Sequence, residues 1–417
     1  MYTDPRQRIS KGFDVRLIAT YLILIIIGWL AVFSSSYDPH AATSFFDFSK
    51  PYCKQLIWMG AAILLAVILL LIESRIYQYF AYHIYVVCLL IMVAVLFIGT
   101  EISGAKAWIK IGSFSIQPTE FAKCATALAL AKFLNEGKTV SERKNIWFLA
   151  SIFLIVPIVI TILQHDAGSA LVFLSFIILF YREGLNQDFI IVSLFAALLA
   201  VVTLMFNEVY SLALLLATYL ALWFFNRRNK KRIIRYSILL GVGIALIFAV
   251  NLAYEHILEP HQKQRIESLF GRTSDPSGID FNITQSKIAI GSGRLFGKGI
   301  GNGTQTKYNF VPEQSTDFVF CGIGEEMGFM GSLLIFGLFG YLIFRIITLS
   351  EKQRNPFVKY YGYGIASVIF FHFVVNIGMT IGLVPVIGIP LPFISYGGSS
   401  LLSFTTMLFI FIKLNES

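Results

Sequence analysis

The chain has 417 residues, of which 56% are hydrophobic and only 14% are charged. This composition excludes an ordinary soluble protein, and the recurring apolar runs of about 20 residues predict an all-α, polytopic membrane protein. The net charge of +9 does not indicate nucleic-acid binding, because the positive residues stand in short loops, where they set membrane topology. The four cysteines and six histidines show no disulfide or metal-ligand spacing, so no metal site is predicted.

The apolar runs predict about twelve membrane spans in a single integral-membrane domain, residues 1–417. The first run, Leu17 to Phe33, is too long for the core of a signal peptide, so we expect an uncleaved helix. The expected spans lie at about residues 16–35, 55–73, 78–99, 119–135, 146–163, 168–182, 188–206, 209–225, 234–254, 317–346, 360–384 and 395–413.

The basic residues of the short loops predict the orientation of these spans. They fall on the same side as the basic N-terminus, and the densest group lies at residues 227–235. Because positive loops stay on the cytoplasmic side, we expect both termini to be cytoplasmic. The long polar loop at residues 255–316 is then extracytoplasmic.

Carboxylates flank a basic, glycine-rich interval of this loop. No acidic residue lies between Phe281 and Pro312, an interval with six glycines and the cations Lys287, Arg294, Lys298 and Lys307. Cations and glycine N–H groups suit an anionic ligand, and a flanking carboxylate suits a general base; the candidates are Asp275, Asp280, Glu313 and Asp317. The glycines do not match a nucleotide-binding P-loop, which excludes ATP. Taken alone, Asp-Pro-Ser-Gly from Asp275 is typical of a turn.

Charged residues inside or beside apolar spans are costly, and each is therefore a candidate for function. Glu120 and Lys123 stand three residues apart on one helix face, so they are expected to pair, either structurally or within a substrate cavity. Asp166 lies in a tight external turn, where capping of the next helix is the simplest role. Of Glu325 and Glu326, one is expected to face the interior, where pairing with a lysine and catalysis both remain open.

The segment at residues 385–395 contains three prolines and is otherwise mostly apolar. It is too proline-rich for a helix and too apolar for an exposed loop. We therefore expect a non-helical or re-entrant segment that is buried in protein near the outer face.

Taken together, these motifs resemble the shape, elongation, division and sporulation (SEDS) family of peptidoglycan polymerases over nearly the whole chain. The most specific motif is Leu-Pro-Phe-Ile-Ser-Tyr-Gly-Gly-Ser-Ser at residues 391–400. The others lie at residues 117–123, 285–293, 303–305, 312–318 and 325–329, and residues 376–379 and 384–388 resemble the RodA branch more than the FtsW branch.

The resemblance implies a glycosyltransferase that polymerises lipid II, a disaccharide-pentapeptide on undecaprenyl diphosphate, outside the bacterial cytoplasmic membrane. It implies a ten-helix core, so twelve spans would require an added hairpin within residues 188–254. It also implies a class B penicillin-binding protein, a transpeptidase, as partner within the elongation machinery, with membrane lipid around the chain.

The resemblance assigns Asp275 as the catalytic base. The substrate-binding candidates are Lys287, Arg294, Lys298, Lys123, Glu120, Asp166, Lys106, Gln285 and Ser286. One departure is that the family arginine before the fourth span is absent, and Lys106 or Lys110 would have to supply its charge, without the bidentate geometry of an arginine. No cofactor is required by the sequence, although a divalent cation, Mg²⁺ or Mn²⁺, is compatible with a diphosphate substrate.

Two other functions are compatible with the same pattern. A flippase for lipid-linked oligosaccharide would depend on charges near the membrane midplane, and a non-catalytic scaffold would need no special residue. Only the enzyme requires Asp275 on the outside.

Overall fold

The computed structural model describes residues 12–36, 47–48, 50–102, 104–112, 114–137, 146–206, 208–256, 263, 267, 279–307, 310–311 and 313–416. The chain divides into two compact units, one formed by Met1–Phe180 with Phe281–Ser417 and the other by Tyr181–Asp280. The larger unit carries most of the predicted site residues.

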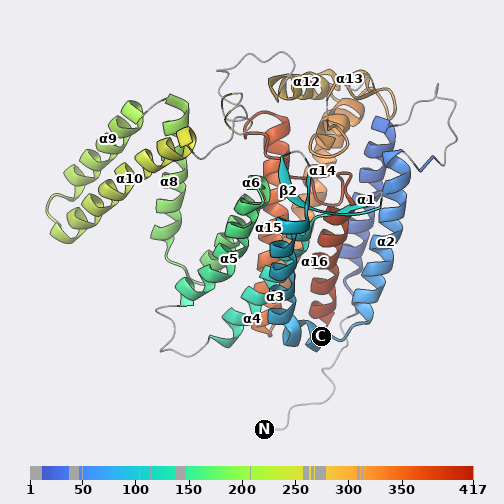
Figure 1. The fold of residues 1–417 in the computed structure, drawn as a ribbon, viewed down its shortest axis with the longest axis horizontal. Helices are drawn as coiled ribbons and strands as arrows, with labels where there is room; N and C mark the ends of the chain where they lie inside the picture. The colour runs from blue at the N-terminus through green and yellow to red at the C-terminus, as the bar shows by residue number, and fades with distance from the viewer. Residues whose placement is uncertain are drawn as a thin grey trace, which may run out of the picture. The chain divides into compact units, whose positions relative to one another are not determined.

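The larger unit is a helical bundle with a small sheet (Figure 1). Its helices are α1 (Val15–Ser36), α2 (Pro51–Leu71), α3 (Ser74–Ile98), α4 (Pro118–Glu136), α5 (Ile146–Leu163), α6 (Ala167–Phe173), η2 (Leu174–Phe176), α7 (Ile177–Arg182), α12 (Ile279–Ser292), α13 (Thr304–Lys307), α14 (Val319–Glu351), α15 (Pro356–Thr380) and α16 (Gly398–Glu416). The smaller unit contains α8 (Gln187–Phe206), α9 (Glu208–Asn226) and α10 (Lys230–His256).

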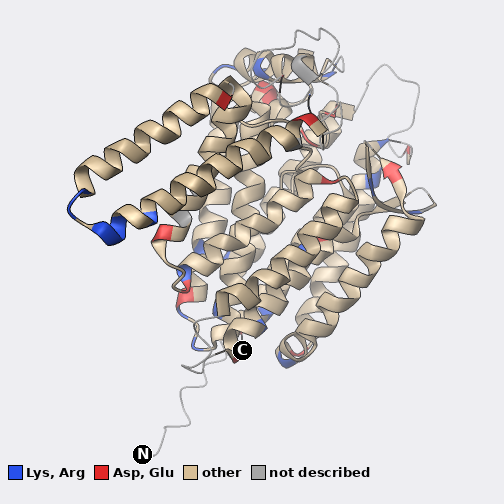
Figure 2. Ribbon diagram, turned by 60° about the vertical axis from the view of Figure 1, so that its left-hand side comes forward, with Lys and Arg blue, Asp and Glu red and all other residues tan. Residues whose placement is uncertain are grey.

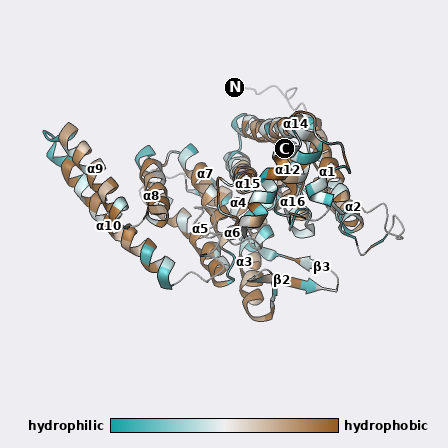
Figure 3. Cartoon of the chain, turned by 90° about the horizontal axis from the view of Figure 1, so that it is seen from above, coloured by the Kyte–Doolittle hydropathy of each residue, from teal (hydrophilic) through white to brown (hydrophobic). Residues whose placement is uncertain are grey.

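Each of the twelve expected spans coincides with a helix or a short helical series. Within the described residues, ten helices are long and apolar enough to cross a membrane: α1, α2, α3, α5, α8, α9, α10, α14, α15 and α16. Figure 3 shows the hydrophobic colours along these helices. The two remaining expected spans are α4 and the shorter series Ala167–Arg182, so a count of twelve membrane crossings stays a prediction.

Helix α4 can contain polar residues because other parts of the protein surround most of it. Fourteen of its 19 residues are buried, and it packs against α3, α5, α15 and α16. Its many alanines allow these neighbours to approach closely, as small residues do in membrane bundles. Glu120 and Lys123 therefore face protein instead of lipid, whereas Glu136 in the last turn is exposed.

A small antiparallel sheet precedes α4 and was missed by the sequence analysis. Strands β1 (Thr100–Ile102), β2 (Ala105–Ile111) and β3 (Phe114–Ile116) are adjacent in that order. Thr100 pairs with Trp108, and Ile109 pairs with Ile116. The signal was present, because lysines and Trp108 alternate with Ala107 and Ile109 at the period of a strand.

The proline-rich segment between α15 and α16 is non-helical and largely buried, as predicted. Its backbone carbonyls find partners inside the bundle: Asn376 donates to the Ile389 carbonyl at 2.8 Å, and a His372 ring nitrogen lies 3.0 Å from the Pro390 carbonyl oxygen. Such pairing is what permits non-helical backbone within a membrane protein. Entry of this segment into the bilayer stays a prediction.

The predicted polar loop is partly helical. Figure 1 shows α12 and α13 lying across one end of the larger unit's helices. Helix α12 is attached there by the Ser286 hydroxyl, which donates to the Thr380 carbonyl at 2.9 Å, and by the fully buried Ala289. Of the remaining predicted loop residues, Glu255 and His256 end α10, and the others are mostly turns or lie outside the described residues.

The smaller unit has a core of Leu199, Leu215 and Ile247. The basic group at residues 227–235 covers the turn after α9 and the first turns of α10, where Figure 2 shows a concentration of blue. The unit contains three helices within the range where an added hairpin was expected, and that hairpin stays a prediction.

Replacement of Gly168 by alanine tests the packing of the proline-rich segment. An added Cβ would lie 2.2 Å from the Ile387 carbonyl oxygen, so Gly168→Ala is expected to lower stability by about 1–3 kcal/mol. The thermal unfolding midpoint of the purified full chain in detergent measures this effect. Gly60→Ala in α2 is the matched control, because its Cβ meets nothing within 4 Å and should leave the midpoint unchanged or slightly raised. Equal midpoints for both variants would contradict the close packing.

Candidate active site

A buried ion pair lies in the first turns of α4. The Lys123 ammonium is 2.7 Å from Glu120 Oε1, and the two residues are 0% and 2% exposed. Glu120 also lies at the helix N-terminus, where the helix dipole favours a negative charge. The predicted pair is therefore present, and neither partner contacts solvent appreciably in this structure.

His372 of α15 is the next polar neighbour of this pair. Its Nε2 lies 2.9 Å from Lys123 Nζ, and its Nδ1 lies 3.0 Å from the Pro390 carbonyl oxygen. The hydroxyl of Ser403 in α16 donates to the Glu120 carbonyl at 2.6 Å. Three helices and the proline-rich segment thus meet at one ionic centre.

One carboxylate oxygen of this centre accepts no hydrogen bond from the described residues. Glu120 Oε2 is buried and has no hydrogen-bond partner among the described residues. A buried carboxylate oxygen without a donor is costly, so a water molecule or a polar ligand group is expected to donate to it.

Asp166 connects the turn before α6 with the start of α4. Its Oδ1 accepts from the Ser169 amide at 3.0 Å, which confirms the predicted helix cap. Its Oδ2 accepts from the Gln117 side-chain amide at 2.6 Å, and Gln117 directly precedes α4. The turn before Asp166 therefore contacts the same helix that carries the ion pair.

Lys106 lies beside this turn. Its backbone N–H donates to the Gln164 carbonyl at 2.9 Å, while its Nζ is 3.5 Å from the Phe97 carbonyl oxygen at an exposed position. Lys110 follows four residues later on the same face of β2 and is exposed. Both lysines remain candidates for the charge of the missing family arginine.

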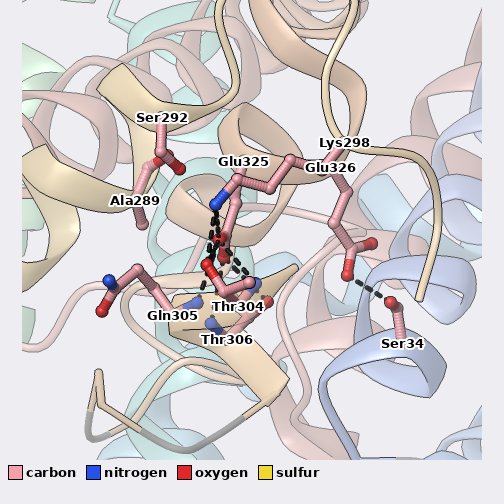
Figure 4. A network of polar contacts seen from close by, with 9 residues as sticks. All are labelled: Ser34, Ala289, Ser292, Lys298, Thr304, Gln305, Thr306, Glu325 and Glu326. Carbon is pink, nitrogen blue, oxygen red and sulfur yellow. Dashed lines mark hydrogen bonds and ion pairs between the residues drawn. The ribbon is translucent and has the colours of Figure 1, made fainter. Parts of the chain in front are cut away.

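The glycine-rich turns are attached to α14 through Glu325. Figure 4 shows its carboxylate between Lys298 and the start of α13. Glu325 Oε1 accepts from Lys298 Nζ and the Thr304 amide, each at 2.7 Å, and from the Gln305 amide at 2.9 Å. Oε2 accepts from the Thr306 amide at 3.0 Å. The predicted interior carboxylate paired with a lysine is therefore Glu325, which is fully buried.

Glu326 is also buried and faces α1. It accepts a hydrogen bond from the Ser34 hydroxyl, whose oxygen accepts from the Gly301 amide at 2.8 Å. Two glycines allow the turns to approach this region closely: an added Cβ at Gly293 or Gly297 would lie 2.0 Å from a carbonyl oxygen of α14. The glycines thus serve close backbone packing here.

The predicted cations lie in different surroundings. Lys298 is paired with Glu325, whereas Lys287 and Arg294 are exposed and pair with no carboxylate within the described part of the chain. Lys287 approaches Gly382 after α15, and Arg294 lies in an open hollow formed by residues 292–298. In the same motif Gln285 is partly buried and Ser286 is fully buried. Substrate binding by these side chains stays a prediction.

Asp275 lies outside the described residues. The structure therefore gives no distance between the predicted base and any predicted cation. His372 and Asn376 were missed as site residues, although an imidazole and an amide four residues apart in an apolar span could have been recognised as costly and hence functional.

Comparison with known proteins identifies the family. The family of cell cycle proteins that comprises FtsW, RodA and SpoVE matches residues 15–230 and 188–417. The chain belongs to this family. It is 32% identical to the peptidoglycan glycosyltransferase RodA of Treponema pallidum, over 95% of this chain and 96% of that protein. It is also 32% identical to the peptidoglycan glycosyltransferase MrdB of Escherichia coli K12, over 83% and 80% of the two chains.

Solved structures support the family assignment, and one of them is a RodA protein. A chain from a peptidoglycan synthase complex, described as coordinating polymerization and crosslinking, superposes with a TM-score of 0.71 at 26% identity, over 97% of this chain and 98% of that one. The rod shape determining protein RodA of Thermus thermophilus gives a TM-score of 0.63 at 25% identity, with 97% of each chain covered.

Glu325→Gln tests the anchoring of the glycine-rich turns. The amide nitrogen that replaces one carboxylate oxygen cannot accept a hydrogen bond, so a buried donor loses its acceptor at a cost of about 1–3 kcal/mol. Hydrogen exchange of the purified chain should become faster across residues 293–307. Glu73→Gln is the control, because its 3.6 Å contact with Arg75 is mostly exposed and should leave that exchange unchanged. Unaltered exchange in Glu325→Gln would contradict the anchoring.

Proposed function

We propose that this chain is a peptidoglycan glycosyltransferase of the RodA branch that polymerises lipid II into glycan strands for cell elongation and rod shape. The relatives that match along most of its length carry the name peptidoglycan glycosyltransferase. One structural observation carries the proposal furthest. Three motifs far apart in sequence meet around α4: Gln117 bonds to Asp166 and, through its backbone N–H, to Ser399 of the 391–400 motif.

The proposed reaction is glycosyl transfer with a diphosphate leaving group. An acceptor sugar hydroxyl attacks the anomeric carbon of the donor, a new glycosidic bond forms, and the bond to undecaprenyl diphosphate breaks. The hydroxyl is a weak nucleophile, so a carboxylate must take its proton, and we assign this role to Asp275. The assignment rests on the family motif alone, because Asp275 lies outside the described residues.

The leaving diphosphate requires positive charge near its oxygens. Lys287 and Arg294 are exposed and free of carboxylate partners within the described segments, which makes them the best-placed cations for this role. Lys298 is 28% exposed and shares its charge with Glu325. Its first role is therefore to hold the turns that present Arg294.

The buried pair is proposed to support the site from within the bundle. Lys123 is fully buried, so in this conformation it does not contact a lipid headgroup at the surface. Together, Glu120 and Lys123 hold the start of α4, where Gln117 contacts Asp166. The unpartnered Oε2 of Glu120 supports an additional polar contact there.

No cofactor is required by this proposal. Within the described residues, no group of three histidine, cysteine or acidic side chains is arranged to hold a metal. A Mg²⁺ or Mn²⁺ ion that arrives with the diphosphate of the substrate is compatible with the reaction, and added chelator tests for it.

We further propose an orientation and a partner. The basic short loops support cytoplasmic termini and an extracytoplasmic α12 region in the bacterial cytoplasmic membrane. The solved complex described as coordinating polymerization and crosslinking supports a class B penicillin-binding protein as the partner, with the lipid tail of the substrate between membrane helices.

Purified protein with lipid II and a class B penicillin-binding protein tests the function. The wild type should form long glycan strands, and Asp275→Asn should lower the rate by about 100-fold or more, the scale expected for loss of a general base. Asp280→Asn is the matched control from the same region and should retain most of the wild-type rate. Strands formed at the wild-type rate by Asp275→Asn would refute the assignment of the base.

The same preparation separates the enzyme from a flippase. In liposomes that contain labelled lipid II, a flippase would move the lipid between leaflets without forming polymer. Translocation without polymer by the wild type would overturn the proposed function, and the absence of both activities would favour a scaffold.

A further inference from the structure

We propose that His372 is a positioning residue that acts through Lys123, as a neutral imidazole of a single tautomer. Its Nε2 accepts a hydrogen bond from the Lys123 ammonium, and its Nδ1–H donates to the Pro390 carbonyl. The effect on catalysis rests on the proposed polymerase function, whereas the hydrogen-bond assignment does not.

The tautomer follows from the partners. A lysine ammonium has only donors, and a backbone carbonyl has only acceptors. Because Lys123 Nζ lies 2.9 Å from Nε2, that nitrogen must carry the lone pair, and the proton must be on Nδ1, which lies 3.0 Å from the Pro390 oxygen. In the opposite tautomer, the Nε2–H would face the lysine N–H donors, and the lone pair of Nδ1 would face the carbonyl oxygen of Pro390. An imidazolium would also oppose two positive donors.

Burial keeps the ring in this arrangement. His372 is 1% exposed, and its ring packs edge to face against Phe404 with 4.8 Å between ring centroids. Lys123 Nζ lies 5.7 Å from the centre of the same Phe404 ring. With no appreciable access to solvent, the two hydrogen bonds of the imidazole have no ready replacement.

The two bonds connect α4 with the proline-rich segment. One turn further along α15, Asn376 donates to the Ile389 carbonyl, so two adjacent carbonyls of the segment are bound by side chains of one helix face. The Ile387 carbonyl oxygen of the same segment packs against Gly168, which follows Asp166 closely. Asp166 in turn binds Gln117 at the start of α4.

These contacts form a continuous series that begins in α4 and returns to the residue directly before α4. It runs from Lys123 through His372 and the proline-rich segment to the Asp166 turn, and returns to Gln117. Displacement of His372 therefore changes the position of Lys123 relative to the outer motifs. This explains why a histidine occupies an otherwise apolar stretch of α15.

Two conservative substitutions separate the two bonds. The amide of a glutamine extends to the position of Nε2, and the amide of an asparagine to the position of Nδ1. His372→Gln should keep the acceptor for Lys123 and lose the bond to Pro390, and His372→Asn should do the reverse. We therefore expect His372→Asn to lower kcat about tenfold or more with little change in KM for lipid II. His372→Gln should retain kcat within about threefold, whereas His372→Asn should lower the thermal unfolding midpoint more, because it leaves a buried ammonium donor without its acceptor.

A double-mutant cycle with Lys123→Met shows whether His372 acts through the lysine. The cycle uses the full chain with its transpeptidase partner, and rates are normalised to folded protein. If His372 acts through Lys123, the variant with both Lys123→Met and His372→Asn should polymerise no more slowly than Lys123→Met alone. Rate losses that multiply, or an unaltered kcat in His372→Asn, would overturn the positioning role.

Nitrogen NMR of the chain with ¹⁵N-labelled histidine tests the tautomer even if a variant fails to fold. The six histidines give few signals, and the His372 signal is the one lost in His372→Gln. We expect a protonated Nδ1 and an unprotonated Nε2. A protonated Nε2 would overturn the proposal whether or not polymer forms. The expected tautomer in a wild type that makes no polymer would overturn the proposed function and the catalytic role, while the hydrogen-bond assignment would stand.

Discussion

The placement of a lysine ammonium inside a membrane bundle is the constraint on which the centre of this structure depends. Breaking a buried ion pair by removing one partner costs about 3–5 kcal/mol, so Lys123 requires both a counter-charge and good hydrogen bonds. Glu120 supplies the charge from one turn away, and His372 supplies a neutral acceptor from a different helix. The second nitrogen of that histidine binds the Pro390 carbonyl, so the same group that stabilises the lysine also fixes non-helical backbone. The position of the proline-rich segment thus follows from the electrostatics of α4.

The same reasoning applies to Glu325 at the start of α14. A glycine-rich stretch with lysines resembles an anion site in sequence, and in the structure an anion does occupy part of it. That anion is a side chain of the protein, which accepts from Lys298 and from the amides of Thr304 and Thr306. Features that suit a diphosphate equally suit an internal carboxylate. The exposed Lys287 and Arg294 are therefore the better candidates for substrate.

Local patterns predicted the elements of this fold well, because hydropathy, caps and helix spacing are properties of neighbouring residues. The helices, the Asp166 cap and the Glu120–Lys123 pair all belong to this class. Contacts between distant residues could not be predicted in the same way. Lys123 and His372 are 249 positions apart, and no local pattern around either residue indicates that they form a hydrogen bond. The sheet at residues 100–116 was missed for a different reason, since its short strands lie in a chain whose long apolar runs dominate the pattern.

The central claim is that the ionic centre of α4 serves polymerisation and not only the fold. The variant with both Glu120→Leu and Lys123→Met tests this most directly, because replacement of a buried ion pair by hydrophobic residues of similar volume is often neutral or stabilising by about 1–4 kcal/mol. The measurement is the rate of lipid II polymerisation per folded molecule, with the thermal unfolding midpoint determined in parallel. We expect a folded protein whose rate falls on the order of 100-fold, since the Asp166 turn and the proline-rich segment lose their fixed position relative to α4. A folded double variant that polymerises lipid II at the wild-type rate would contradict the claim.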